Sequence, residues 1–164
     1  MRTLVDLQPG DIILFKGKGI VASLVKFFTK SKYSHAAMVL TNNMIIEANW
    51  YKKVNIVEFK YDSSVMEIYR LKGGLNANQQ LILLQSSYDM LNKYYDYAQL
   101  LGYVLERFIG KQYDNPLNFD NFIICSELID KSYHKLGIDL VEYRSYGNVT
   151  PDDLAKSKHL ERIL

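Results

Sequence analysis

Short apolar runs bounded by turn signals fill the first half of the chain and predict β-strands. Pro9-Gly10-Asp11 is a turn signal, and the apolar run Ile12–Phe15 that follows is typical of a buried strand. The runs His35–Leu40 and Met44–Ala48 flank Thr41-Asn42-Asn43, a pattern that predicts a β-hairpin with a three-residue loop. Two further strands are expected at Val54–Phe59 and Val65–Leu71.

Apolar residues recur at helical spacing in most of the second half. The spacing predicts helices over Asn76–Leu91 and Ala98–Ile109, separated by Tyr94-Tyr95-Asp96-Tyr97. Another helix is expected to begin at Cys125 and to end near Gly137, because glycine suits a left-handed C-terminal cap. Two shorter helices are predicted, an amphipathic one over Ile20–Thr29 and one that begins at Thr150-Pro151-Asp152-Asp153.

This order of elements favours an α+β fold. Strands gather in the first half and helices in the second, so the alternation typical of a parallel α/β sheet is missing. The 164 residues are about the size of one average domain, and 48% of them are apolar. We therefore expect one domain over residues 1–164.

Charge and cysteine content narrow the class of protein. The 20 basic residues barely exceed the 18 acidic ones, and a nucleic-acid-binding protein would usually show a concentrated basic excess. The single cysteine permits no internal disulfide, and clustered Cys/His spacing is absent, so we expect neither a bound metal nor another cofactor. The N-terminus lacks a signal-peptide core, and no apolar run approaches the roughly 18 residues of a membrane span, so a cytoplasmic protein is expected.

Cys125 lies where the strand-like run Phe122-Ile123-Ile124 gives way to the predicted helix. In the first turn of a helix, the macrodipole and several unpaired backbone N–H groups favour a thiolate. The same N–H groups can stabilise an oxyanion. Cys125 is thus a candidate nucleophile, and the alternative is a small buried hydrophobic residue.

A cysteine nucleophile needs a base, and the chain offers His35, His134 and His159. His134 follows Cys125 by nine residues on the same predicted helix, so it points to the opposite side, about 12 Å or more along the axis. His159 lies in a charged tail without a rigid element to aim it. His35 begins a strand after a polar loop, which is where a general base can be held firmly, although an isolated histidine there is often structural.

The hairpin register supplies a partner for His35. If Leu40 pairs with Met44, Ala37 lies opposite Glu47, and His35 shares the face of Ala37 because strand side chains alternate. Glu47 then lies diagonally across from His35 and can accept a hydrogen bond from its ring. A two-residue loop would instead turn Glu47 to the other face. The alternative is a half-exposed strand position for Glu47.

The chain resembles the circularly permuted papain-like thiol hydrolases, specifically the YiiX/YebB-like branch of the NlpC-type superfamily. The resemblance rests on segments spread over nearly the whole chain: Pro9-Gly10-Asp11-Ile12-Ile13, Tyr33-Ser34-His35-Ala36-Ala37-Met38-Val39, Ile46-Glu47-Ala48, Tyr94-Tyr95-Asp96-Tyr97, Ile124-Cys125-Ser126-Glu127-Leu128-Ile129 and Val149-Thr150-Pro151-Asp152-Asp153-Leu154. It implies a permuted papain-like fold in which an antiparallel sheet or small barrel packs against helices.

The resemblance also implies roles and a reaction. Cys125 would be the nucleophile, His35 the base and then the acid, and Glu47 the residue that orients the imidazole. The reaction would be acyl transfer through a thioester, with cleavage of the amide bond of a small peptide or amino-acid amide as the leading expectation. The alternatives are a lipid acyltransferase or thioesterase and a catalytically silent binding module.

Two further features bear on the substrate. Tyr33, Trp50 and Tyr95 lie beside the candidate triad in sequence, and aromatic side chains often line small-ligand sites. The lysines of the amphipathic segment Ile20–Thr29 would suit a membrane surface, which favours a lipid-derived acyl substrate. An aromatic residue at any one of these positions is more often part of the core.

Overall fold

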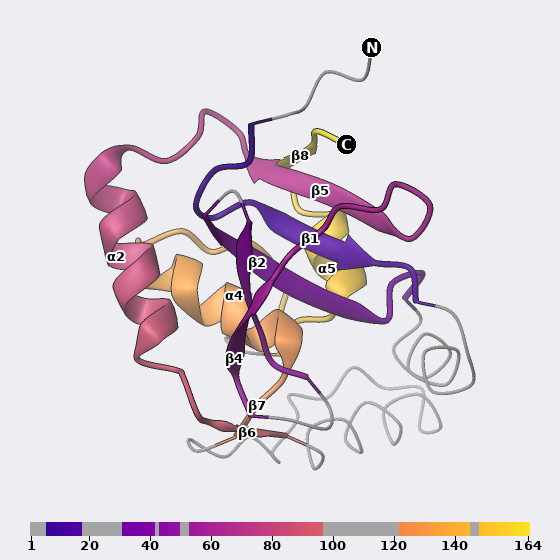
Figure 1. Cartoon of the computed structure of the whole chain (residues 1–164). Coiled ribbons are helices and arrows are strands. Elements are labelled where there is room, and N and C mark those ends of the chain that lie inside the picture. The colour runs from indigo at the N-terminus through magenta and orange to yellow at the C-terminus, as the bar shows by residue number, and fades with distance from the viewer. Residues whose placement is uncertain (1–5, 18–30, 42, 50–52, 97–121, 145–147) are drawn as a thin grey trace.

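The central element is an antiparallel sheet (Figure 1). The computed structural model describes residues 6–17, 31–41, 43–49, 53–96, 122–144 and 148–164. Within them the sheet has the strand order β4-β3-β2-β1-β5-β8. Its strands are β1 (Ile12–Phe15), β2 (His35–Thr41), β3 (Met44–Glu47), β4 (Asn55–Glu58), β5 (Met66–Leu71) and β8 (Leu160–Arg162). The five strands predicted in the first half are confirmed.

The β2-β3 hairpin reaches the expected register by a different route. Thr41, rather than Leu40, pairs with Met44, so the prediction for the tip of the hairpin was wrong. A β-bulge between Val39 and Thr41 absorbs one residue, and Met38 pairs with Ile46. This pairing is the one that the longer loop would have produced, so Glu47 remains on the expected face.

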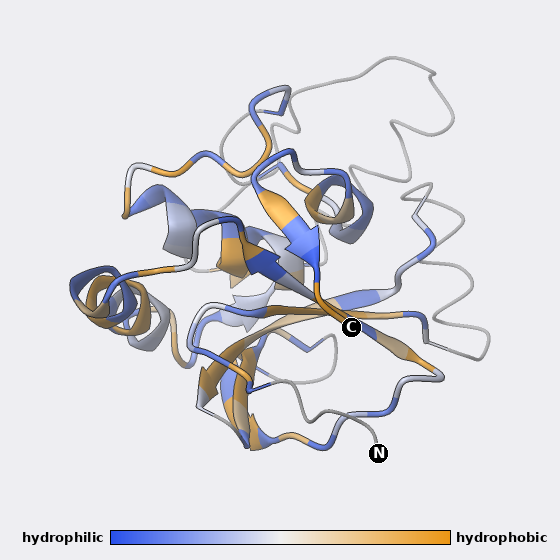
Figure 2. Cartoon of the chain, turned by 90° about the horizontal axis from the view of Figure 1, so that it is seen from above, coloured by the Kyte–Doolittle hydropathy of each residue, from blue (hydrophilic) through white to orange (hydrophobic). Residues whose placement is uncertain are grey.

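In the described part of the chain, three helices lie on one side of the sheet: α2 (Ala77–Tyr88), α4 (Cys125–His134) and α5 (Pro151–Ala155) (Figures 1 and 2). Helix α4 packs directly on β2 and is flanked by α2 and α5. The main core fills the space between these layers. It includes Ile12, Leu14, Met38, Ile46, Leu128, Ile129 and Tyr133, which are all fully buried.

A second, smaller core lies on the other face of the curved sheet. Ile13, Ala37, Val39, Ile45, Phe59 and Ile68 form it, and Leu7 and Leu164 from near the two ends of the chain pack against it. Residues adjacent along β1 and β2 therefore serve different cores, as strand alternation requires. The edge strands β4 and β8 do not pair with each other, so the structure is an open sheet and not a closed barrel.

The predicted helix boundaries follow their capping residues. Asn76 caps α2, where its side chain accepts from the Gln79 backbone N–H and the Gln79 side chain accepts from the Asn76 backbone N–H. Thr150 caps α5 in the same way with Asp153. Gly137 adopts φ +73° just beyond α4, which is the left-handed conformation expected of a glycine after a helix end.

The sequence pattern missed two short strands, and the strand-like run before Cys125 is confirmed as a third. Strands β6 (Tyr94–Tyr95) and β7 (Phe122–Ile123) pair in parallel as a separate two-stranded sheet. Strand β8 follows the tail that carries His159, so that tail enters a rigid element, contrary to the sequence interpretation. Strands β6 and β8 are too short for a periodic signal, and β8 forms because β5 offers it a ladder of backbone groups.

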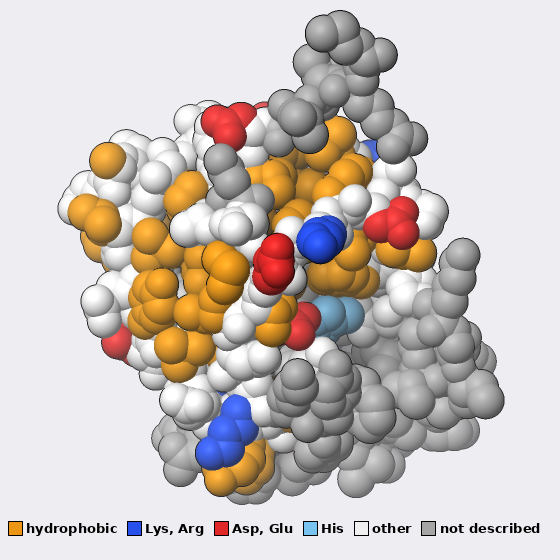
Figure 3. Space-filling view, viewed as in Figure 1, with side chains coloured by type: hydrophobic (Ala, Val, Ile, Leu, Met, Phe, Trp, Pro, Cys, Tyr) orange, Lys and Arg blue, Asp and Glu red, His pale blue; other side chains and the backbone are white. Residues whose placement is uncertain are grey.

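Helix α2 presents apolar side chains to solvent. Leu81, Ile82 and Tyr88 are exposed, and hydrophobic side chains gather on that side of the molecule (Figure 3). None of the helices in the described part of the chain combines the length and apolar character needed to cross a bilayer. The helices predicted over Ile20–Thr29 and Ala98–Ile109 lie outside the described residues.

Candidate active site

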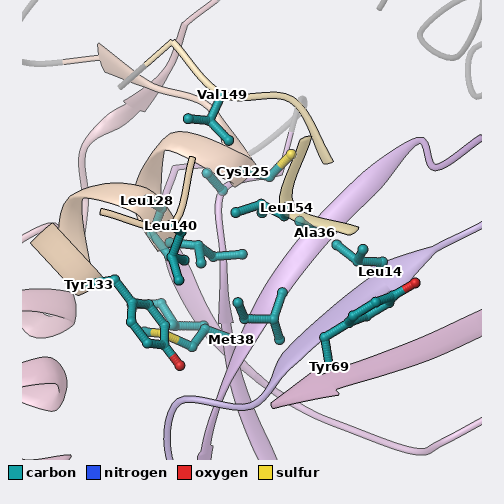
Figure 4. Packing of buried hydrophobic residues seen from close by; sticks show 14 of the residues in the cluster. Leu14, Ala36, Met38, Tyr69, Cys125, Leu128, Tyr133, Leu140, Val149 and Leu154 are labelled. Carbon is teal, nitrogen blue, oxygen red and sulfur yellow. The ribbon is translucent and has the colours of Figure 1, made fainter. Parts of the chain in front are cut away.

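Cys125 is the first residue of α4, and Ile124 alone separates it from β7, so the strand-to-helix junction lies where the sequence predicted. Ile124 has extended backbone angles, φ −98° and ψ 166°, so the chain turns sharply from strand to helix at this point. Cys125 lies at one end of the main core beside Ala36 and Leu154, whereas Tyr133 lies at the other end (Figure 4). The Cys125 residue is 6% exposed, so it is buried among apolar groups at the N-terminus of a helix.

His35 begins β2, and the adjacent strand β1 fixes its position. It pairs in register with Phe15, and the two ring centroids lie 5.3 Å apart. Just before it, the Ser34 backbone N–H donates to the Phe15 carbonyl at 2.8 Å. The imidazole is 21% exposed, so it is held by packing and still reaches solvent.

Glu47 contacts the imidazole as the register predicted. Its Oε2 lies 2.7 Å from His35 Nε2, and its side chain is 12% exposed. A carboxylate only accepts hydrogen bonds, so Nε2 carries the shared proton and Nδ1 is left for other partners. The other carboxylate oxygen, Oε1, accepts from Asn49 Nδ2 at 3.2 Å. Both oxygens of Glu47 are therefore held in place.

His35 and Cys125 shift each other's pKa in opposite directions. Burial alone would lower the pKa of His35, but hydrogen bonding and charge at Cys125 and Glu47 raise it to about 10. Burial would likewise raise the pKa of the Cys125 thiol, but His35 lowers it below its ordinary value. The two shifts together favour a thiolate beside an imidazolium at neutral pH.

Backbone groups also stabilise the thiolate. The N–H groups of Ala36 and Ser126 hydrogen-bond the Cys125 sulfur and contribute to its lowered pKa. Ser126 is fully buried and donates its hydroxyl to the Val149 carbonyl, which ties the first turn of α4 to the segment before α5. Glu127 in the same turn is also fully buried, and it forms an ion pair with Lys131 one turn later. The positive end of α4 thus faces the sulfur.

The other two histidines lie away from this pair. His134 is exposed at the last residue of α4, as helical geometry predicted. His159 Nε2 lies 3.2 Å from Glu142 Oε1 at the surface. Of the described histidines, only His35 interacts with the thiol.

The three aromatic residues singled out in the sequence have different positions. Tyr33 is 0% exposed, and its hydroxyl interacts with Glu67 and Tyr69, a placement that argues against substrate contact. Tyr95 is half-buried in β6, beside the strand that leads to Cys125. Trp50 lies outside the described residues. Substrate contact by Tyr95 and Trp50 stays a prediction.

Sequence reasoning missed two polar residues near the candidate site, Asn49, which binds Glu47, and the buried Glu67. Asn49 follows the strand that carries Glu47, and an asparagine just past a strand looks like an ordinary loop residue. Glu67 occupies the buried face of β5. Its signal was available, since a carboxylate at an apolar position of an alternating strand needs a partner. Among the described residues, no group of three or more His, Cys, Asp or Glu side chains could hold a metal ion.

Comparison with known proteins agrees with this architecture. A crystal structure described as the metalloprotein yiiX from Escherichia coli O157:H7 superposes with a TM-score of 0.71 at 21% identity, and the match covers 96% of each chain. No curated protein matches the chain. Residues 6–164 match the model of a family described as permuted papain-like amidase enzymes, YaeF/YiiX, C92. With the fold and the family model in agreement, the chain belongs to the permuted papain-like amidases of the YaeF/YiiX (C92) family, a family of cysteine hydrolases.

Proposed function

We propose that this amidase-family chain cleaves amide bonds through a Cys125-His35-Glu47 triad and a thioester acyl-enzyme. The observation that carries the proposal is the position of His35, which interacts with the Cys125 sulfur and with Glu47 at the same time. A histidine held between a thiol and a carboxylate has its ring orientation and its proton fixed before substrate arrives.

The reaction begins at the ion pair. The Cys125 thiolate attacks the amide carbonyl, a C–S bond forms, and the carbonyl π electrons move onto oxygen. The C–N bond then breaks as the His35 imidazolium gives its proton to the leaving nitrogen, which departs as an amine. A water molecule next attacks the thioester while neutral His35 takes its proton. Loss of the thiolate releases the carboxylic acid and restores the ion pair.

The oxyanion would be stabilised at the N-terminus of α4. The first N–H groups of a helix have no partner within it. The Cys125 N–H belongs to the same residue as the attacking sulfur, so it lies near the substrate carbon to which that sulfur bonds. The macrodipole adds a favourable field for the negative charge. We therefore assign the Cys125 backbone N–H as one oxyanion donor.

Small peptides and amino-acid amides are the substrates we propose, because the family is an amidase family. The alternative is a lipid-derived acyl substrate. The sequence feature that favours it is the basic amphipathic segment Ile20–Thr29, which lies outside the described residues. The triad chemistry is the same for both, since an amide and an ester each present a carbonyl to the thiolate. The first experiment therefore probes the thiol and needs no natural substrate.

The experiment measures the rate of Cys125 alkylation by iodoacetamide between about pH 5 and pH 10. The wild-type rate should titrate with a midpoint below about 8.5, the ordinary value for a cysteine. His35→Ala should move the midpoint up to that value. His134→Ala is the matched control and should leave it unchanged, because His134 is exposed at the far end of α4.

A second measurement detects the covalent intermediate. Incubation with the activated ester p-nitrophenyl acetate, followed by intact-mass spectrometry, should show one acetyl group on the wild-type chain and none on Cys125→Ala. A wild-type thiol that titrates at the ordinary value, with no acetyl adduct, would contradict the proposal.

A further inference from the structure

A buried carboxylate lies behind the proposed triad. Glu67 on β5 is 7% exposed. Its Oε2 accepts from the hydroxyls of Tyr33 and Tyr69, the latter at 3.1 Å. Three cations surround it, namely Lys16 at 2.7 Å, Arg162 at 3.2 Å and Lys32 at 3.6 Å. We refer to these six residues as the Glu67 cluster.

The Glu67 cluster lies at the same end of the sheet as His35. Leu14 on β1 pairs with Glu67 on one side and with Ala36 on the other. The next residue, Phe15, pairs with His35. Glu67 therefore lies two strands away from Ala36, the residue that follows His35. Like Leu14 and Ala36, it faces the side of the sheet that α4 covers.

Tyr33 connects the cluster to His35 through the backbone. It lies two residues before His35, is 0% exposed, and places its hydroxyl 2.9 Å from that of Tyr69. Its own backbone N–H is held by the Ser31 hydroxyl at 2.9 Å. The chain is thus anchored at Tyr33, two residues before the pairing of β2 with β1 begins at His35.

We propose, on the basis of the proposed function, that Tyr33 is a positioning residue that sets the His35 imidazole against Cys125, with Glu67 as its fixed acceptor. The Tyr33 hydroxyl is bound to Glu67 and Tyr69, and the side chain is fully buried, so the role does not require contact with substrate. Tyr33 acts by fixing where the first residue of β2 begins. This role accounts for a polar network buried beside an apolar core, which otherwise costs free energy without serving packing.

The protonation states suit this role. Burial would raise the pKa of Glu67, but the hydrogen bonds from Lys16, Tyr33 and Tyr69 lower it to about 2. Burial and the neighbouring Glu67 raise the pKa of Tyr33, so its hydroxyl stays a donor. Donor and acceptor therefore keep the same roles at every pH at which a cysteine hydrolase works.

The two tyrosines provide a matched pair of variants. Tyr33→Phe and Tyr69→Phe each remove one hydroxyl bonded to the same carboxylate oxygen, and each leaves an aromatic ring in the core. Only Tyr33 leads directly into His35. A displacement of about 1 Å at a reacting group can cost on the order of a hundredfold in rate, so the loss of one anchor among several should cost about tenfold.

The test again measures the pH dependence of Cys125 alkylation by iodoacetamide. Tyr33→Phe should raise the titration midpoint and reduce the rate at neutral pH by about tenfold. Tyr69→Phe should keep the wild-type midpoint and a rate within about twofold of wild type. Urea unfolding should show similar losses of stability for the two variants, because each loses one hydrogen bond to a charged group.

Glu67→Gln serves as the second variant, because it keeps the shape of the acceptor and should shift the midpoint in the direction of Tyr33→Phe. Equal alkylation profiles for Tyr33→Phe and Tyr69→Phe would overturn the inference, whether both match wild type or both are impaired. Failure of the proposed function is distinguishable, since it would appear as an unchanged profile in His35→Ala itself.

Discussion

Nε2 of His35 lies 2.7 Å from Oε2 of Glu47, although the two residues are twelve positions apart in the chain. The contact depends on the bulge between Val39 and Thr41, because without it the tighter tip of the hairpin would turn Glu47 to the opposite face. One irregular residue in a strand thus decides whether the imidazole has a carboxylate to orient it. Asn49 completes the arrangement by binding the second oxygen of that carboxylate.

Amide hydrolysis should show a bell-shaped dependence on pH. Activity requires the thiolate and the imidazolium together, so it rises as pH passes the lowered pKa of Cys125 and falls as pH passes the raised pKa of His35, at about 10. These limbs belong to the coupled pair and not to either residue alone. Initial rates with a small peptide p-nitroanilide provide the measurement, and a maximum confined to acidic pH would contradict the ion pair.

Glu47→Gln should reduce the hydrolysis rate by about a hundredfold, which is within the range for removing support from an acid-base residue. The amide keeps the volume of the carboxylate and loses its charge, so the pKa of His35 should fall and the alkaline limb of the profile should move to lower pH. Asn49→Ala removes one hydrogen bond from a neutral amide and leaves the charge of Glu47 in place, so it should cost less than tenfold. Equal rates for wild type and Glu47→Gln would exclude an orienting role for Glu47.

Gly10→Ala should destabilise the fold by about 1–3 kcal/mol. Gly10 has φ +94°, and an added Cβ would lie 2.7 Å from Leu75 Cδ1 and 3.1 Å from the Tyr133 hydroxyl. Gly74→Ala is the control, because Gly74 also has a positive φ, +70°, with no atom near an added Cβ. Urea denaturation should therefore show a larger loss for Gly10→Ala, and the difference measures the cost of crowding.

Acid should weaken the fold partly through Glu67. Its pKa in the folded chain is about 2, below the ordinary value of about 4.3. A depressed carboxylate pKa adds stability above the ordinary value, and this stability is lost as pH falls through the folded value. Glu67→Gln lacks the contribution, so its free energy of unfolding should fall less than that of wild type between about pH 5 and pH 2. Glu58→Gln, at an exposed position on β4, should keep the wild-type slope.

The sequence by itself determined most of the local elements and the candidate residues of the site. Asn76, Thr150 and Gly137 mark helix ends in the sequence, because their capping roles depend only on nearby backbone groups. The junction at Cys125 was also local, since a strand-like run meets a helix there. The register of the β2-β3 hairpin could be counted from the sequence, and it predicted that Glu47 lies near His35, because the two residues belong to neighbouring strands joined by a short turn.

Tertiary structure decided the contacts that span the chain. Cys125 meets His35, ninety residues earlier, only because α4 packs on β2. Strand β8 forms because β5 offers it a ladder, and the Glu67 cluster forms because β1, β5, β8 and the segment before β2 converge at one end of the sheet. Such contacts leave no periodic trace, since their free energy comes from partners that are distant in sequence. That is why the sequence could single out Cys125 and His35 as candidates, whereas only the folded chain shows that they come together and what surrounds them.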